Sequence, residues 1–184
     1  MNKSQMGLHI PILESRRIIL KPLGKEFISK DYVNWMNDFD VVKFMSSGGD
    51  YTLEKLKIYI EKVEEVPQYF WAIVSKKSNT HIGNIKIDPI DNKNRFGEYG
   101  IMLGDRNFQG KGFASEASRL VIKFCFEKLY LRKINLGVLS KNKNAIYLYK
   151  ALGFSVEGKF KKHIFHRGDF EDIIRMATFN NNFL

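Results

Sequence analysis

The stretch Gln109-Gly110-Lys111-Gly112-Phe113-Ala114 (QGKGFA) lies between two segments of different hydrophobic periodicity. Before it, Gly97 to Leu103 alternates enough apolar residues to predict a strand, and Gly104 to Phe108 predicts a loop. From Ala114 to about Leu129, apolar residues recur at intervals of three and four, which predicts an amphipathic helix. The stretch is therefore predicted to be a glycine loop that joins a strand to the start of a helix.

A glycine loop at the start of a helix favours an anionic ligand. The first turn of a helix leaves backbone N–H groups without intrahelical partners, and the helix dipole adds partial positive charge. Gly110 and Gly112 carry no side chain that would keep a phosphate away from the backbone. We therefore expect Gln109 to Ala114 to bind a phosphate group.

Two familiar phosphate-binding loops fit this spacing poorly. In a P-loop, Ser or Thr follows the lysine, but here Gly112 follows Lys111, and the interval from Gly104 is one residue too long. A dinucleotide-binding loop would have Gly or Ala at Ser115 and an acidic residue about twenty positions later, where this chain has Leu129-Tyr130-Leu131. The spacing excludes the first loop and disfavours the second.

The loop does match a third motif. Gln109, Gly112 and Ala114 occupy every defined position of Gln/Arg-x-x-Gly-x-Gly/Ala, the pyrophosphate-binding motif of the GNAT acetyltransferase superfamily. Further along, Asn142 to Phe154 (NKNAIYLYKALGF) resembles the same family's later motif, with an Asn at a helix start, a Leu-Tyr pair and a closing Gly-Phe. A strand is predicted between the two, at Lys133 to Leu139. The chain is thus similar to GNAT enzymes.

Within that superfamily, the opening residues Glu14 to Leu23 and the later Trp35-Met36-Asn37-Asp38 are most similar to the Rim-type branch. The resemblance implies an α+β (mixed α/β) GNAT fold, in which a twisted, mainly antiparallel sheet of about seven strands splays open between its fourth and fifth strands. About four helices would flank the sheet. Strands four and five would be Gly97 to Leu103 and Lys133 to Leu139. We expect residues 1–184 to form one such domain with a flexible tail at about 180–184.

The other elements follow from hydrophobic pattern and turn residues. The remaining strands are expected at Ile18–Leu23, Tyr69–Val74, His81–Ile90, Val156–Phe165 and Phe170–Thr178, and the remaining helices at Lys30–Phe44, Leu53–Val66 and after Asn142.

The resemblance further implies acetyl-CoA as co-substrate. The residues expected to bind it are Met102, Leu103, Gln109, Gly110, Lys111, Gly112, Phe113, Ala114, Asn142 and Asn144. The side-chain amide of Gln109 could reinforce the pyrophosphate contact, and either Asn could equally cap its helix. Tyr149, at the family's Leu-Tyr position, is the candidate acid that protonates the departing thiolate, although periodicity alone favours a core aromatic. Tyr147 is expected to face elsewhere.

The resemblance implies direct attack by a primary amine, with no covalent acyl-enzyme. A lysine of pKa about 10.4 is uncharged in roughly one molecule per thousand at pH 7, whereas an α-amine of pKa near 8 is uncharged in about one in ten. Glu98 is our candidate for the general base, with a solvent-facing strand residue as the alternative. Trp35, Tyr51, Trp71 and the basic stretch Lys159 to Arg167 are expected to line the acceptor pocket.

The acceptor class is left open by the sequence. It includes a nucleotide-linked amino sugar, which the basic stretch favours, a polyamine or antibiotic amine, and a protein N-terminus. A non-catalytic acetyl-CoA-binding module and an RNA-associated protein are alternatives of other classes. The sequence also leaves open whether two copies associate as a homodimer.

Composition narrows the class of protein. The chain has 30 Lys and Arg against 20 Asp and Glu, a net charge of +10, but no nucleic-acid-binding motif accompanies this charge. There is no apolar run long enough to span a membrane and no secretory signal before Pro11, so a cytoplasmic protein is expected. Cys125 is expected in the core, and the spacing of His163 and His166 on one strand gives no metal signature, so no metal is expected.

Overall fold

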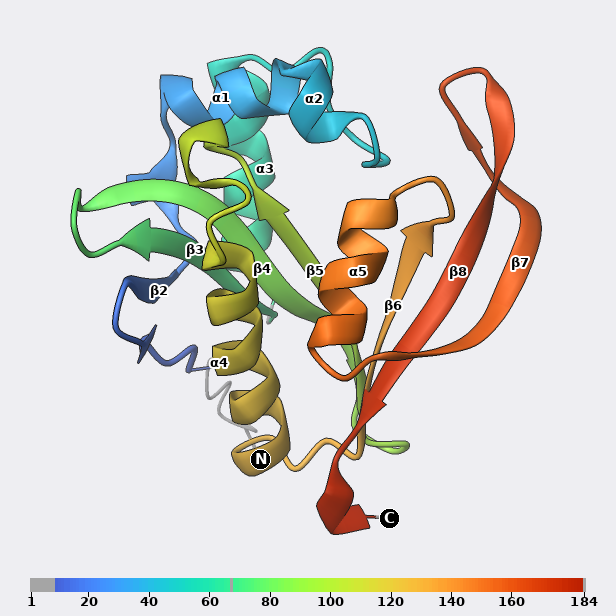
Figure 1. The fold of residues 1–184 in the computed structure, drawn as a ribbon. Helices are drawn as coiled ribbons and strands as arrows, with labels where there is room; N and C mark the ends of the chain where they lie inside the picture. The colour runs from blue at the N-terminus through green and yellow to red at the C-terminus, as the bar shows by residue number, and fades with distance from the viewer. Residues whose placement is uncertain (1–8, 67, 184) are drawn as a thin grey trace, which may run out of the picture.

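The structure is a computed structural model that describes residues 9–66 and 68–183. Within these residues, eight strands form one sheet in the order β1-β2-β3-β4-β5-β6-β8-β7 (Figure 1). The strands are β1 Leu13–Glu14, β2 Ile18–Pro22, β3 Tyr69–Ser75, β4 Thr80–Asp91, β5 Phe96–Leu103, β6 Lys133–Leu139, β7 Ser155–His166 and β8 Asp169–Phe179. The helices are α1 Lys30–Asn37, α2 Phe39–Val42, α3 Leu53–Glu65, α4 Phe113–Glu127 and α5 Lys143–Ala151. The predicted α+β class is confirmed.

The sheet opens between β5 and β6, the pair of strands expected to splay. All other neighbours are antiparallel, whereas β5 and β6 are parallel and pair only from Phe96 with Lys133 to Glu98 with Asn135. β5 continues to Leu103 and β6 to Leu139, so their carboxyl ends diverge, as Figure 1 shows. The predicted splay between these strands is confirmed.

Side chains on both faces of the sheet are buried. In β3, Trp71 and Ile73 belong to a core formed with α4 and α5, while the alternate residues Phe70, Ala72 and Val74 belong to a second core with α1 and α3. Successive strand residues point to opposite faces, so a strand covered on both sides is apolar along its whole length. Figure 1 shows α4 and α5 in front of the sheet and α3 behind it.

The segment expected to be one helix from Lys30 to Phe44 is two helices. The break is at Asp38, whose backbone is extended and whose side chain accepts a hydrogen bond from the Asp40 N–H, capping α2. Asp is a preferred N-cap because its carboxylate satisfies an N–H that has no partner in the helix. This break and the short strand β1 raise the counts from about seven strands and four helices to eight and five among the described residues.

The end of the chain packs against α4. Asn180 is 6% exposed, and its amide donates to the carbonyls of Phe126 and Leu131. Asn181–Phe183 form a single 3-10 turn, and Leu184 lies outside the described residues. Cys125 is fully buried on α4, where burial raises the pKa of its thiol, so the expected core position of Cys125 is confirmed.

Gly104 is predicted to be essential for the packing of α1 on the end of β5. A β-carbon at Gly104 would overlap the Trp35 ring, whereas one at Gly100 would meet only the stem of Lys86, at 3.6 Å. We expect Gly104→Ala to lower the free energy of unfolding by about 1–3 kcal/mol through overpacking. Thermal unfolding measures this effect, with Gly100→Ala as the control that leaves the midpoint unchanged or slightly higher. Equal midpoints for the two variants would contradict this packing.

Candidate active site

A cavity of about 740 Å³ occupies the gap between the diverging ends of β5 and β6. It is lined from the α4 and α5 side by Gln109, Ala114, Asn142, Asn144, Leu148 and Tyr149. It is lined from the α1 to α3 side by Tyr32, Phe44, Tyr51, Tyr59, Phe70, Asn84 and Lys86. Ligand pockets commonly have volumes of about 300–1,000 Å³, so the cavity is large enough for two reactants or one extended ligand.

The predicted glycine loop leads directly into α4. Gly110 and Gly112 have φ values of +69° and +81°, a region that L side chains rarely adopt, and Gly112 is the N-cap of the helix. The first helical N–H to donate within α4 is that of Glu116, to the Gly112 carbonyl, so those of Phe113, Ala114 and Ser115 have no intrahelical partner. A β-carbon at Gly110 would meet open space. The loop thus has the open backbone that an anion site needs.

Arg17, which the sequence did not single out, holds this loop in place. Its Nη1 donates to the Lys111 carbonyl at 2.9 Å, and its guanidinium lies 4.3 Å from the centre of the Phe113 ring. Its Nε is paired with Glu116 Oε2 at 2.6 Å. Burial would raise the pKa of Glu116, but hydrogen bonds from Ser15 and Arg17 hold it below its ordinary value. The turn before β2 is thereby tied to the start of α4.

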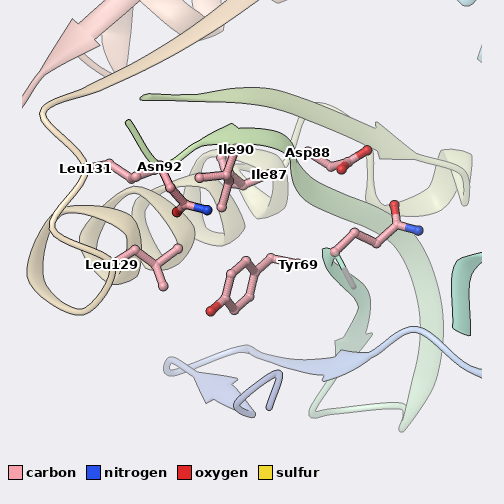
Figure 2. A pocket seen from close by; sticks show the side chains of 8 residues that line it. Tyr69, Ile87, Asp88, Ile90, Asn92, Leu129 and Leu131 are labelled. Atoms are coloured by element: carbon pink, nitrogen blue, oxygen red, sulfur yellow. The ribbon is translucent and has the colours of Figure 1, made fainter. Parts of the chain in front are cut away.

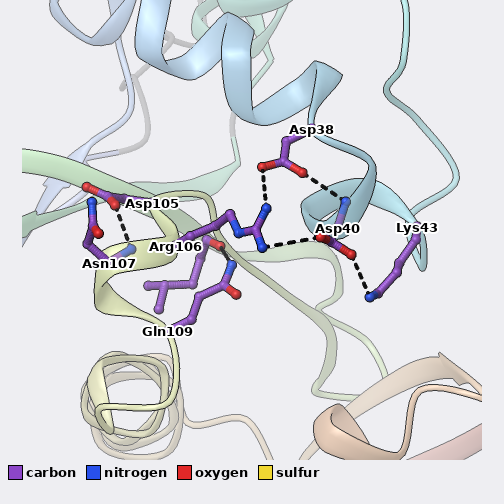
Figure 3. A network of polar contacts seen from close by, with 8 residues as sticks. Asp38, Asp40, Lys43, Asp105, Arg106, Asn107 and Gln109 are labelled. Carbon is purple, nitrogen blue, oxygen red and sulfur yellow. Dashed lines mark hydrogen bonds and ion pairs between the residues drawn. The ribbon is translucent and has the colours of Figure 1, made fainter.

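The Gln109 side chain binds protein rather than facing an open site. Its Nε2 donates to the Leu103 carbonyl at 2.8 Å, which links the loop to the end of β5 (Figure 3). In the same figure, Arg106 reaches Asp38 and Asp40 at the start of α2, at 3.5 and 3.2 Å. The amide that was expected to reinforce a pyrophosphate contact therefore fixes the loop instead. Gln109 still lines the cavity, as do Met102 and Leu103.

Three tyrosines on β5 and α5 differ sharply in their surroundings. The Tyr99 hydroxyl bonds to Ser118 Oγ at 2.6 Å, and Ser118 in turn donates to the Ala114 carbonyl. Tyr149 lines the cavity at 9% exposure, and its hydroxyl has no hydrogen-bond partner in the part of the chain that the structure describes. Burial raises the pKa of Tyr149 to about 12. Tyr147 is 76% exposed, so of these three Tyr149 is the one with a free hydroxyl in the cavity.

The two asparagines of the second motif also reach the cavity. Asn142 is the N-cap of α5, and its Oδ1 accepts a hydrogen bond from the Ala145 N–H at 3.2 Å. Asn142 and Asn144 both line the cavity. Asn142 therefore caps the helix while facing the place where a cofactor is expected.

Glu98 does not reach the cavity. Both of its carboxylate oxygens accept hydrogen bonds from Arg175 at 2.7 Å, and Oε2 also accepts one from Asn135 at 2.7 Å. These partners lie on β8 and β6, so Glu98 joins three strands at the base of the splay. This geometry indicates a structural role in place of the predicted general base.

Two of the three predicted acceptor residues are also elsewhere. Trp71 is fully buried against α4, and its Nε1 donates to the Pro11 carbonyl at 2.8 Å. Trp35 is 9% exposed and packs on the His81 ring, 4.9 Å away. Tyr51 does line the cavity. From the basic stretch Lys159 to Arg167, the residue that lines it is Ile164. We therefore assign Trp35 and Trp71 to the core.

The tip of the β7–β8 hairpin contacts α2 and the residue that follows it. His166 Nε2 lies 2.8 Å from the Lys43 carbonyl, and Arg167 Nη2 donates to the Val42 carbonyl at 3.4 Å. Arg167 also lies over the Phe39 ring, at 4.8 Å. His163 contacts the Phe160 ring instead, so the two histidines of this strand have separate partners. Within residues 9–66 and 68–183, no cluster of three potential metal ligands is found.

A second hollow, of about 270 Å³, lies near the other end of α4 (Figure 2). Its lining includes Tyr69, Ile87, Asp88, Leu129 and Leu131, and it shares no residue with the cavity in the splay. No predicted site residue lines this hollow. Every helix of the described chain is too short or too polar to cross a membrane.

Comparison with known proteins fits this geometry. A family model described as an acetyltransferase (GNAT) domain matches residues 17–155, which is most of the chain and includes all of both motifs. The chain belongs to the GNAT acetyltransferase family. The membership predicted from Gln109 to Ala114 and from Asn142 to Phe154 is thus confirmed.

The relatives of this GNAT protein include enzymes whose names state an acceptor and others whose names do not. Spermidine N(1)-acetyltransferase of Escherichia coli (strain K12) is 35% identical over 102 residues, which is 55% of this chain and 54% of that enzyme. The match thus spans about half the length of that relative. A probable N-acetyltransferase of Bacillus subtilis (strain 168) is 27% identical over 92% of this chain and 97% of its own length.

Solved structures share the fold at lower identity. A GNAT-family acetyltransferase of Bacillus anthracis superposes with a TM-score of 0.82 at 20% identity, covering 92% of this chain and 99% of its own. Spermidine N-acetyltransferase of Vibrio cholerae, in complex with CoA and spermine, gives 0.78 at 23% identity, covering 89% and 95%. The ribosomal-protein-S5-alanine acetyltransferase of Vibrio fischeri also gives 0.78, at 22% identity, covering 95% and 99%. The fold therefore does not discriminate between these acceptors.

The surroundings of Glu98 predict the behaviour of Glu98→Gln. Because the carboxylate pairs with Arg175 and does not line the cavity, the variant should lose about 1 kcal/mol of unfolding free energy. The pH dependence of its acetyl transfer should match that of the unchanged protein. Rates of CoA release between pH 6 and 9 measure this, with Glu127→Gln on the exposed face of α4 as control. A loss of rate that higher pH restores would return Glu98 to the role of base.

Proposed function

We propose that this GNAT protein is an acetyl-CoA-dependent N-acetyltransferase that transfers the acetyl group to a primary amine by direct attack in a ternary complex. The observation that carries this proposal is the cavity of the splay, whose lining includes Gln109 and Ala114, at the two ends of the glycine loop, together with Tyr149. The cofactor and the amine would meet where β5 and β6 have separated.

The α4 and α5 side of the cavity would hold the cofactor. The open N–H groups of Phe113, Ala114 and Ser115 would bind the pyrophosphate, assisted by the helix dipole. Asn142 and Asn144, at the start of α5, would contact the pantetheine arm. Met102 and Leu103 would offer backbone groups to the thioester, whose oxygen gains negative charge in the transition state.

Tyr149 would act as the acid for the departing thiolate. With a pKa of about 12, its hydroxyl keeps its proton throughout the physiological pH range. A free thiol has a pKa of about 8.5, so proton transfer from Tyr149 would be uphill unless the thiolate is also desolvated. The low exposure of Tyr149 means that a thiolate beside it would share the same desolvation. The geometry therefore favours a hydrogen bond that strengthens as the thiolate forms.

The amine would arrive with little help from a protein base. Of the described residues that line the cavity, Lys86 is the one that carries a charge. An amine of lower pKa is uncharged more often, in about one molecule in ten near pKa 8 against roughly one in a thousand at 10.4. We therefore propose a small-molecule amine of lowered pKa, such as a nucleotide-linked amino sugar, as acceptor. A protein N-terminus, whose α-amine also has a low pKa, is the second candidate.

Cofactor binding at the glycine loop is tested by Gly112→Glu. A carboxylate at the start of α4 would repel the pyrophosphate and occupy its place, so the affinity for acetyl-CoA should fall by at least about tenfold. Isothermal titration calorimetry measures the affinity. Gly168→Glu is the matched control, since Gly168 also has a positive φ, of +91°, but lies in open space at the tip of the β7–β8 hairpin. Equal affinities for the two variants would contradict the proposed loop site.

The role of Tyr149 is tested by Tyr149→Phe. The matched control is Tyr147→Phe, two residues earlier on the same helix. Loss of the acid should lower turnover by about 10²–10⁴-fold while the affinity for acetyl-CoA stays within about twofold, because the ring remains in place. Tyr147→Phe should leave both unchanged. Binding of acetyl-CoA without CoA release from any amine, in the unchanged protein, would favour a non-catalytic binding module instead.

A further inference from the structure

Asn84 has an unsatisfied hydrogen-bond donor at the wall of the cavity. The residue is 3% exposed, it lines the cavity, and its Nδ2 is buried without a partner among the described residues. Buried polar groups are nearly always hydrogen-bonded, because an unpaired one costs about 1–3 kcal/mol. Two such atoms are found among the described residues, His81 Nδ1 and Asn84 Nδ2, and only Asn84 lines the cavity. The unpaired donor of Asn84 is therefore the one that a ligand in the cavity could satisfy.

His81 fixes the direction in which this donor points. His81 Nε2 lies 2.9 Å from both the Gly83 carbonyl and Asn84 Oδ1. The Gly83 carbonyl can only accept, so Nε2 carries the hydrogen, and the Asn84 oxygen is the atom that faces His81. Burial lowers the pKa of His81, which keeps the ring neutral. Asn84 thus has its oxygen occupied and presents its N–H₂ group elsewhere.

Lys86 adds a positive charge on the same face of β4. Asn84 and Lys86 are two residues apart on one strand, so their side chains share a face of the sheet. Both line the cavity, and Gly100 on β5 leaves room for the Lys86 stem, whose Cγ would be 3.6 Å from a β-carbon there. The nearby carboxylates of Asp88 and Asp50 are paired with Lys86 and Lys55, at 3.4 and 2.5 Å. Asp88 therefore balances part of the Lys86 charge in the free protein. Asn84 Nδ2 and Lys86 Nζ are the nitrogen donors of this wall, beside the hydroxyls of its serines and tyrosines.

The rest of the acceptor side is aromatic and apolar. Tyr32, Phe44, Tyr51, Tyr59 and Phe70 surround the two donors. Such a wall fits the body of an organic molecule, while the donors fit an oxygen-bearing group on it. A polyamine has no oxygen that could accept hydrogen bonds from these donors, and its second ammonium group would lie near the like charge of Lys86, at an energetic cost.

We propose that Asn84 and Lys86 form an oxyanion-binding subsite, and that the acceptor is a primary amine that also carries a carboxylate or phosphate group. This inference rests on the proposed acetyl transfer and specifies its acceptor. Asn84 binds the oxyanion through Nδ2, Lys86 binds it through Nζ, and His81 is a positioning residue that orients the Asn84 amide. A polyamine is excluded as the preferred acceptor.

The test is a matched set of acceptors at saturating acetyl-CoA, followed by release of the CoA thiol. The set contains ω-amino carboxylates, aminoalkyl phosphates of the same chain lengths, the plain alkylamines and spermidine. We expect kcat/KM for the best oxyanion-bearing amine to exceed those of the matched alkylamine and of spermidine by at least about tenfold, the scale of one charge-assisted contact. The carboxylate and phosphate series then identify which oxyanion the subsite takes.

Variants assign the preference to these residues. Lys86→Gln should lower kcat/KM for the oxyanion-bearing amine about tenfold, leave the alkylamine unchanged, and leave acetyl-CoA affinity unchanged. Lys62→Gln, on the exposed face of α3, is the control that changes none of the three. Asn84→Asp, which replaces the donor by a carboxylate, should shift the preference towards spermidine. If this buried variant fails to fold, Lys86→Gln decides alone.

The outcomes separate this inference from the function on which it rests. Transfer to spermidine or alkylamines at least as fast as to the oxyanion-bearing amines would overturn the subsite while leaving the acetyltransferase intact. So would a Lys86→Gln variant that affects all amines equally. Acetyl-CoA binding with no thiol release from any amine would overturn the proposed function, and the acceptor inference with it.

Discussion

The site depends on the point at which β5 and β6 stop pairing. Glu98 and Asn135 are the last paired residues, and the Glu98 carboxylate is held by Asn135 on β6 and by Arg175 on β8. Beyond this point, backbone groups of β5 and β6 have no partner strand on that side, and such groups must be satisfied by some other donor or acceptor. The ion pair at the base of the splay therefore marks where the continuous sheet ends. Beyond this point, a ligand can take the place of the missing partner strand.

The two cores bring different chemical groups to the two sides of this gap. One core, with α4 and α5, brings a helix N-terminus and the hydroxyl of Tyr149 to the gap, while the other, with α1 and α3, brings aromatic rings and the donors of β4. A sheet without a splay would keep these two faces apart, because successive side chains of a strand point to opposite sides. Because the strands diverge, groups from both faces of the sheet reach one cavity. In the proposed function, the cofactor and the amine would enter this cavity from opposite faces.

The sequence predicted what depends on local patterns. The glycine loop, the N-cap at Asn142 and the position of Tyr149 are encoded within segments of six to thirteen residues, and each lies where it was expected. Trp71 and Glu98 were expected at the site from the sequence, but neither lines the cavity. Their contacts come from Pro11 and Arg175, which are 60 and 77 positions away along the chain. Arg17 was missed for the same reason. Asn84 gave no separate signal, since it alternates with Lys86 and Asp88 as one of the ordinary polar positions of the strand from His81 to Ile90.

The positive charge of the acceptor wall also bears on the reaction itself. The attacking amine must be uncharged, and a nearby cation lowers the pKa of an amine by destabilising its ammonium form. Lys86 would therefore favour the reactive form of a bound amine to the extent that its charge is not balanced by Asp88 or by the bound oxyanion. A one-unit fall in the pKa of the amine raises its uncharged fraction about tenfold when that fraction is small. Because none of the described lining residues is a carboxylate or a histidine, binding of an anionic group and any lowering of the amine pKa would both depend on this lysine.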